Sequence, residues 1–465
     1  MTTNTATPGG WRTSPAWSPA RWRADPMADA TLTRAAAPAR PLAAYAAVTA
    51  AYWAFMLTDG ALRMLVLLHF HELGFTPLQL AYLFLLYEAA GVVTNLSAGW
   101  IAARFGLTAT LYAGLILQIG ALAALAALDP GWTLWLSVAF VTLAQGVSGV
   151  AKDLAKMSSK SAVKLLAPAN EQGALFRWVA ALTGSKNAVK GVGFFMGGAL
   201  LAAFGFEASV LGMAAGLTVI LVAVAALMPA GLPRGKAKVK FSEVFSKDRD
   251  VNRLCAARLF LFGARDVWFV VGIPIYFYSV WSDGTPEGNR AAFFAIGTFM
   301  AVWIVGYGAV QAFAPQLLRA KAKAVREIAG MATRWVGLLA FIPAALALAA
   351  FAAQEGGSLA AALGDPDRWL TATVIGGLLL FGVVFALNSS VHSYLILAFT
   401  SSERVTMDVG FYYMSNAAGR LVGTLLSGLS FQAGGLPLCL LTAAAMAGLS
   451  WVFAGTIEGR DAESA

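Results

Sequence analysis

Seven basic side chains lie inside strongly apolar segments of this 465-residue sequence, where a charge is costly. They are Arg63, Lys186, Lys190, Arg258, Arg265, Arg334 and Arg420. The counter-charges in the same segments are few: Asp59, Glu88 and Asp266. A charge near the centre of a bilayer costs at least about 2.5–3.5 kcal/mol, so such residues usually face a polar cavity or a partner. The excess of cations therefore predicts a cavity that holds an anion.

The spacing of the first pairs places their charges on common helix faces. Asp59 and Arg63 are four residues apart, as are Lys186 and Lys190, and residues at this spacing are neighbours on a helix. The first pair reads either as an ion pair between helices or as a cavity pair, in which Arg63 grips an anion and Asp59 restrains it when the site is empty. Arginine has the planar fork that suits phosphate or arsenate oxygens. Both lysines are expected to bind the anion. Lys190 is too central for its ammonium to reach the interface easily, whereas Lys186 can alternatively snorkel there.

Further candidates lie later in the chain. Arg265 and Arg420 are deep in their segments and are expected to bind substrate, whereas Arg258 lies nearer an end and suits a gate. Asn388 and His392 share a face of a polar stretch at 388–394. They are expected either to bind a hydroxyl-bearing substrate or to join helices by hydrogen bonds.

Buried acids and repeated lysines suggest two accessory roles. Asp59, Glu88 and Asp266 are each candidates for taking up a proton during the cycle, and the sequence does not choose among them. Four lysines repeat every fourth residue, at 152, 156, 160 and 164. Such a stripe follows from an excess of positive charge near the cytosol and from contact with anionic lipid, or it guides an approaching anion.

Motifs for enzymatic or metal chemistry are missing from the sequence. Cys255 and Cys439 both fall in apolar segments, so we expect neither a disulfide nor a metal site. His69 and His71 end an apolar segment without an evident third ligand, and His392 is far from them in sequence. No HExxH, GxSxG or aspartyl dyad motif is present. We therefore expect no enzyme, no metal, no cofactor and no nucleic-acid partner.

The segments that carry these residues predict an all-α polytopic membrane protein. Hydrophobic residues make up 59% of the chain and charged residues 12%, against about 25% charged in soluble domains. Twelve transmembrane helices are expected, with turn signals between them. Their ranges are 42–70, 78–103, 107–128, 133–152, 174–204, 207–230, 254–280, 289–316, 327–353, 369–399, 406–432 and 435–456.

The flanking charges orient these helices. With the N-terminus in the cytosol, 24 of the 33 Lys and Arg residues fall in cytosolic segments, two in outer loops and seven within the spans. This bias supports both termini inside. The expected organisation is a disordered cytosolic tail (1–41), a six-helix half (42–230), a basic cytosolic linker (231–253), a second six-helix half (254–456) and a cytosolic tail (457–465).

Two six-helix halves are typical of the major facilitator superfamily. Residues 99–107 resemble its signature loop, with Gly99, Arg104 and Gly106 in place. The sequence departs from that pattern at Ala103 and Leu107, where an aspartate and a basic residue are usual. The resemblance implies a gate loop at these positions and puts its usual ion pair in doubt.

Longer stretches resemble the organoarsenical efflux permeases of the ArsJ family. The matching stretches are 52–55 and 57–65, 151–154 and 156–158, and 182–187 and 190–195. The resemblance covers about 42–456 and implies export of 1-arseno-3-phosphoglycerate, the ester that glyceraldehyde-3-phosphate dehydrogenase makes from arsenate. A substrate with two anionic heads needs two cationic clamps, for which we expect Arg63 with Lys190 and Arg265 with Arg420.

The resemblance also indicates the cellular location and the partners that we expect. It implies an efflux permease in the inner membrane of a bacterium. The burial of the three acids makes proton exchange the expected driving force, so we expect an antiporter. Its partners would be the lipid bilayer, the small anionic organoarsenical and, functionally, the dehydrogenase, with the permease itself a monomer. The alternative is the same fold carrying another organic phosphate or inorganic phosphate.

Overall fold

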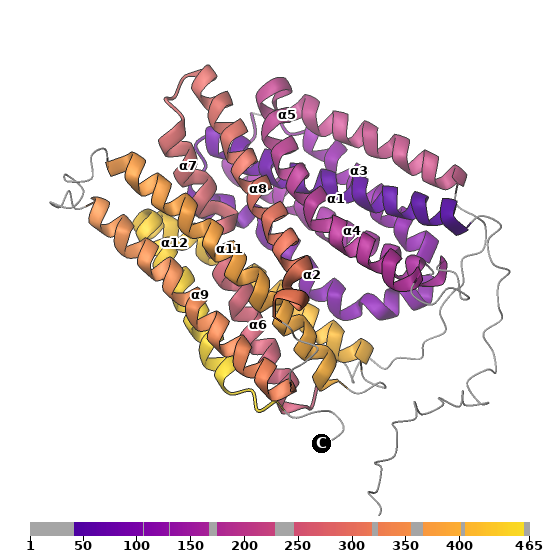
Figure 1. The fold of residues 1–465 in the computed structure, drawn as a ribbon. Helices are drawn as coiled ribbons and strands as arrows, with labels where there is room; N and C mark the ends of the chain where they lie inside the picture. Colours follow the sequence, from indigo (N-terminus) through magenta and orange to yellow (C-terminus); the bar gives the residue numbers. More distant parts are fainter. Residues whose placement is uncertain are drawn as a thin grey trace, which may run out of the picture. The chain divides into compact units, whose positions relative to one another are not determined.

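The computed structural model describes residues 41–105, 107–129, 131–166, 174–227, 246–318, 324–354, 366–400 and 405–459, all within one compact unit. Over these ranges the regular secondary structure is helical (Figure 1). The elements are α1 (Pro41–Glu72), α2 (Pro77–Phe105), α3 (Leu107–Ala126), α4 (Leu134–Leu166), α5 (Ala174–Leu227), α6 (Arg249–Val267), η2 (Trp268–Gly272), α7 (Ile273–Trp281), α8 (Pro286–Leu317), α9 (Val325–Gln354), α11 (Pro366–Phe399) and α12 (Val405–Gly455).

Ten helical stretches within the described ranges are long and apolar enough to cross a membrane. Two of them, in α5 and α12, are interrupted by non-helical glycines. Gly205 has φ 74° and Gly435 has φ 61°, a left-handed conformation that glycine adopts without steric cost. These glycines lie between the predicted spans 174–204 and 207–230, and between 406–432 and 435–456. Counted on either side of them, the segments match the twelve expected spans.

The helices pack in two groups. In the first, α1 packs against α5, and α4 against α2 and α3; in the second, α12 packs against α6 and α9, and α11 against α8 and α9. Figure 1 shows the first group in indigo to magenta and most of the second in orange to yellow. Contacts between the groups run mainly through α2 with α12 and through α5 with α8. These two pairings border the polar cavity described below.

Glycines bring α1 and α5 into close contact. A Cβ atom added at Gly193 would lie 2.6 Å from the carbonyl oxygen of Leu57, and one at Gly60 would lie 2.8 Å from that of Lys190. Glycine lets two helix backbones approach in this way. The contact fixes the relative positions of Arg63, on α1, and Lys190, on α5.

The span that carries Arg265 contains a π-helix, η2, immediately after Val267. Such single turns leave backbone groups without their usual helical partners and are frequent at functional sites. The amides of Val271 and Gly272 both donate to the hydroxyl of Ser427 on α12, at 3.2 Å each. The thiol of Cys439 donates to the carbonyl of Val267 at 3.2 Å. The π-helix is therefore held by α12, and each of the two cysteines is a single buried thiol.

Turn chemistry begins the helices where the sequence indicated breaks. Thr76 and Gln79 form a reciprocal capping box at the start of α2, with the Gln79 side chain accepting from the Thr76 amide at 2.8 Å. Before α8, the carboxylate of Asp283 accepts from the amide and hydroxyl of Thr285, and these bonds lower the pKa of Asp283. Asp248 caps α6, so this helix starts five residues before the predicted span. Most of the predicted linker and both tails lie outside the described residues.

Candidate functional site

A polar cavity of about 660 Å³ lies between the two helix groups. Its lining comes from α1, α2, α4, α5, α6, α8, α11 and α12. Six of the seven predicted intramembrane cations line it: Arg63, Lys186, Lys190, Arg258, Arg265 and Arg420. Lys152 and Lys156 from the lysine stripe join them, and the lining carboxylates are Glu88, Asp153 and Asp266. The cavity thus contains eight basic side chains against three acidic ones among the described residues.

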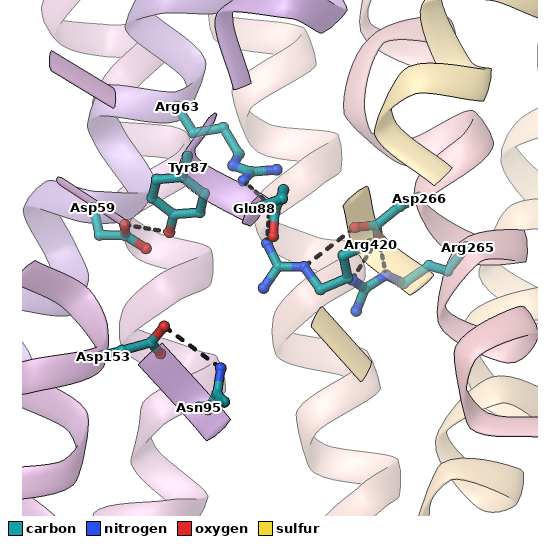
Figure 2. A network of polar contacts seen from close by, with 9 residues as sticks. All are labelled: Asp59, Arg63, Tyr87, Glu88, Asn95, Asp153, Arg265, Asp266 and Arg420. Carbon is teal, nitrogen blue, oxygen red and sulfur yellow. Dashed lines mark hydrogen bonds and ion pairs between the residues drawn. The ribbon is translucent and has the colours of Figure 1, made fainter. Parts of the chain in front are cut away.

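Glu88 is the centre of an ionic network that crosses between the groups (Figure 2). Its Oε1 accepts from Arg63 Nη2 on α1 at 2.5 Å and from Arg420 Nη2 on α12 at 2.5 Å. Arg420 also contacts Asp266 Oδ2 through Nε at 3.3 Å. Arg265 in turn donates to Asp266 Oδ1 at 2.6 Å. Only 1% of the Glu88 surface is exposed, so these bonds act where water screens them little.

Asp59 and Arg63 do not pair with each other, and Arg63 instead makes the alternative that the sequence left open, an ion pair between helices. Asp59 accepts instead from the hydroxyl of Tyr87 at 2.5 Å, whereas Arg63 extends to Glu88 (Figure 2). The guanidinium of Arg63 also lies 5.0 Å from the Tyr87 ring centroid, a cation–π geometry. The four-residue spacing correctly placed Asp59 and Arg63 on one helix face. It could not show that α2 gives each of them a separate partner, Tyr87 and Glu88.

Three cations that line the cavity have no carboxylate within ion-pairing distance among the described residues. Lys152 lies over the ring of Tyr87, 3.9 Å from its centroid, and Lys190 lies 5.7 Å from the centroid of Phe194. Arg258 donates to the carbonyl and hydroxyl oxygens of Ser389, at 3.1 and 3.0 Å. No carboxylate of the described residues therefore neutralises these three groups directly.

Acids of the protein already pair with both arginines of the predicted clamp, Arg265 and Arg420. Both arginines contact Asp266, and Arg420 also contacts Glu88. A ligand would have to displace a carboxylate to use Arg420. Lys190, from the other predicted clamp, stays accessible to a ligand, and Lys186 lines the same cavity.

Asn388 and His392 do not line the cavity, which corrects their expected contact with substrate. Both are fully buried, and their polar side-chain atoms have no hydrogen-bond partner among the described residues. Ser390 and Ser393 line the cavity in their place, together with Tyr394. Successive residues of a helix turn by about 100°, so these three lie on the face opposite Asn388 and His392. The polar stretch extends around α11, and its sequence could not give the rotation of the helix.

Aromatic and amide side chains complete the lining. Tyr52, Trp303 and Tyr307 contribute rings, and Gln311 and Asn416 contribute amides. Nothing in the sequence pattern singled out these rings or Gln311. Asn416 could be found because it precedes Arg420 by four residues on one face.

The cavity is closed at one end. The Leu78 amide at the start of α2 donates to the Gln432 side chain on α12 at 3.1 Å. Near it, Asn289 of α8 donates to Glu72 of α1 at 3.0 Å. From the ionic network the lining instead runs toward Asn95, where α2 approaches its end. The lining residues thus lie toward the ends where α2 and α4 finish and α6 and α12 begin.

Other predicted features lie elsewhere. Arg334 of α9 is exposed and does not line the cavity. The surroundings of Gly99, the side chain of Arg104 and the whole of Gly106 lie outside the described residues, so the gate loop stays a prediction. Within the described ranges, no cluster of three His, Cys, Asp or Glu residues could hold a metal ion. A separate apolar cavity of about 640 Å³, bordered by α2, α4 and Leu421, contains no charged side chain.

Comparison with known proteins supports the fold. No protein-family model matches the sequence, and no curated protein matches it. Among solved structures, a crystal structure of the nucleoside transporter NupG is similar, with a TM-score of 0.64 and 15% sequence identity. The likeness covers 89% of this chain and 98% of that one. At this identity it shows the fold alone, and it confirms the all-helical major facilitator fold predicted from the sequence.

Proposed function

We propose that the protein is an alternating-access transporter for a small organic anion with two charged heads. The observation that carries this proposal is one cavity, shared by both helix groups, with eight basic and three acidic side chains. Buried cations without neutralising partners are destabilising, so an anionic ligand offsets a cost that the empty cavity carries. Because the lining comes from both groups, a ligand bound there can be passed from one side to the other as the groups rock.

The proposed cargo is 1-arseno-3-phosphoglycerate, and its export would give arsenate resistance. The resemblance of the sequence to the organoarsenical efflux permeases supports this choice. In the cavity, Lys190 and Lys152 belong to the first group and Arg258 to the second. We assign one anionic head to Lys190 and the other to Arg258, with Ser390 and Gln311 nearby as donors for the hydroxyl.

The proposed orientation places the open side of the cavity in the cytosol. The excess of basic residues in the segments predicted to be cytosolic supports this choice. The protein then faces inward, with its outer end closed by Leu78, Gln432, Glu72 and Asn289. We propose that it resides in the bacterial inner membrane, with both termini cytosolic, and that Lys156 attracts the anion as it approaches from the cytosol.

Transport into everted vesicles tests the proposal. Glyceraldehyde-3-phosphate dehydrogenase, NAD+, arsenate and radiolabelled glyceraldehyde 3-phosphate in the medium generate the ester on the cytosolic face. We expect vesicles with the protein to accumulate label only when arsenate is present. Lys190→Met and Arg258→Gln each remove a charge-assisted contact, so uptake should fall about tenfold or more. Arg334→Gln, an exposed charge outside the cavity, is the matched control and should leave uptake unchanged.

Two results would redirect the proposal. Arsenate-independent uptake of labelled inorganic phosphate or of 3-phosphoglycerate would favour another phosphate as cargo. Uptake that persists after the proton gradient is collapsed would remove proton exchange as the driving force. In that case the proton-coupling role proposed for Asp59, Glu88 and Asp266 would also fall.

A further inference from the structure

Glu88 occupies a place that suits an anionic ligand. A single oxygen of its carboxylate accepts from two arginines, Arg63 of the first group and Arg420 of the second, each at 2.5 Å (Figure 2). Oxyanions such as phosphate and carboxylate are bound by arginine through the same charge-assisted bonds. The carboxylate comes from α2, within the protein, so it can compete with any anion that enters the cavity.

A third cation lies near Glu88 and has no carboxylate of its own among the described residues. The ammonium of Lys152 rests on the ring of Tyr87, the residue before Glu88 in sequence, 3.9 Å from its centroid. A Cβ atom added at Gly91, one turn after Glu88 on α2, would lie 3.9 Å from the Lys152 ammonium. Glu88 and Lys152 are both buried. Glu88 therefore has two alternative partners, the arginine pair in which it is found and a lysine nearby.

The arginine pair also needs an anion whenever the two helix groups come together around it. Arg63 and Arg420 lie on opposite groups and meet at the same Glu88 oxygen. Without an anion between them, two buried like charges repel each other strongly in a medium of low dielectric constant. Asp266 offsets part of the charge of Arg420 but does not contact Arg63.

We infer that Glu88 is a resident stand-in for the transported anion. This inference rests on the proposed function. In the empty protein, Glu88 bridges Arg63 and Arg420. The two helix groups can therefore pass through the state that is closed on both sides without a bound substrate. When the substrate arrives, the anionic head that Lys190 contacts also takes the arginine pair, and Glu88 turns to Lys152. The same bridge then exists in the loaded protein, with the substrate in place of the carboxylate.

The inference separates two modes of transport. Net transport requires the empty protein to return, and this step needs Glu88. Exchange of substrate on one side for substrate on the other never passes through the empty protein, so it does not need Glu88. A carboxylate with a purely structural role would support both modes equally.

Reconstituted proteoliposomes measure both modes with the same labelled ester, generated outside by the dehydrogenase, NAD+, arsenate and radiolabelled glyceraldehyde 3-phosphate. For net transport the lumen contains buffer. For exchange it contains the same reagents without label, so that unlabelled ester forms inside. We expect Glu88→Gln to lower net uptake about tenfold or more while exchange stays within about twofold of wild type. Glu207→Gln, at an exposed carboxylate of α5 outside the cavity, should change neither mode.

Lys152→Met provides the opposite perturbation. It removes the partner that Glu88 needs only when substrate is bound. We expect the apparent KM to rise about tenfold in both modes, while the maximal rate of net uptake stays within about threefold of wild type. For the other variant, Glu88→Gln, retained exchange would show that the protein is folded although its net uptake is lowered.

The outcomes are distinct. If Glu88→Gln loses both modes in parallel, or retains both, the stand-in role is wrong. If Lys152→Met lowers the maximal rate with an unchanged KM, Lys152 is not the alternative partner. If the wild-type protein moves no label in either mode, the proposed function itself fails and the inference fails with it.

Discussion

Substitution of Gly193 tests whether the α1–α5 contact sets the site. An alanine Cβ there would lie 2.6 Å from the Leu57 carbonyl oxygen and 3.2 Å from the Gly60 Cα, and both are backbone atoms that cannot rotate away. The two helices must therefore separate locally. A Cβ added at Gly212 of the same helix would meet no atom within 4 Å, so Gly212→Ala is the matched control.

The expected magnitude follows from the difference between the two variants. Overpacking of this kind typically costs about 1–3 kcal/mol. The gain in helix propensity from glycine to alanine, about 1 kcal/mol, applies to both variants and cancels in the comparison. Gly193→Ala should therefore be about 1–3 kcal/mol less stable than Gly212→Ala.

Unfolding of the purified proteins in a titration with sodium dodecyl sulfate, followed by tryptophan fluorescence, measures this difference. Transport should fall in Gly193→Ala as well, because the contact positions Arg63 against Lys190. Equal stability of the two variants would refute the close packing of α1 on α5. It would also remove the argument that this packing fixes the cations of the first group.

Two further substitutions test the second group and the closed end. Ser427→Ala removes the acceptor of two amides of the π-helix and should lower the free energy of unfolding by about 1–3 kcal/mol. Hydrogen exchange should become faster at those two amides. Unchanged exchange there would contradict the assignment. Gly428→Val places a Cβ 2.4 Å from the carbonyl oxygen of Pro77 and should hold the closed end apart. Spin labels at Leu73 and Ala433 should then move farther from each other, and an unchanged distance distribution would contradict closure by this contact.

Much of the fold could be predicted because its signals are local. Apolar length and turn residues mark each span, and the glycines at 205 and 434–435 interrupt helices where the sequence indicated breaks. The convergence of the cations on one cavity was also predictable, because a charged side chain within a membrane usually faces a polar cavity or a partner.

The partners of these cations could not be predicted, because they depend on how helices rotate about their axes. Asp59 faces Tyr87 rather than Arg63, and Arg420 reaches Glu88 from a helix more than 300 positions away in sequence. On α11 a polar stretch extends around the helix, so composition alone did not separate His392 from Ser390. Spacing in the sequence indicates which residues share a helix face. Only the packing of the helices shows which residues of other helices that face contacts.

The π-helix gives the span of α6 and α7 an unusual degree of freedom. Its wide turn holds one residue more than an α-turn, so the segments before and after it are out of step by about 100°. If that extra residue migrated one turn toward α6, the stretch bearing Arg265 and Asp266 would rotate by about this angle and shift by about 1.5 Å along its axis. The protein could then swing these two charges away from Arg420 by a local register change, without displacing the whole helix.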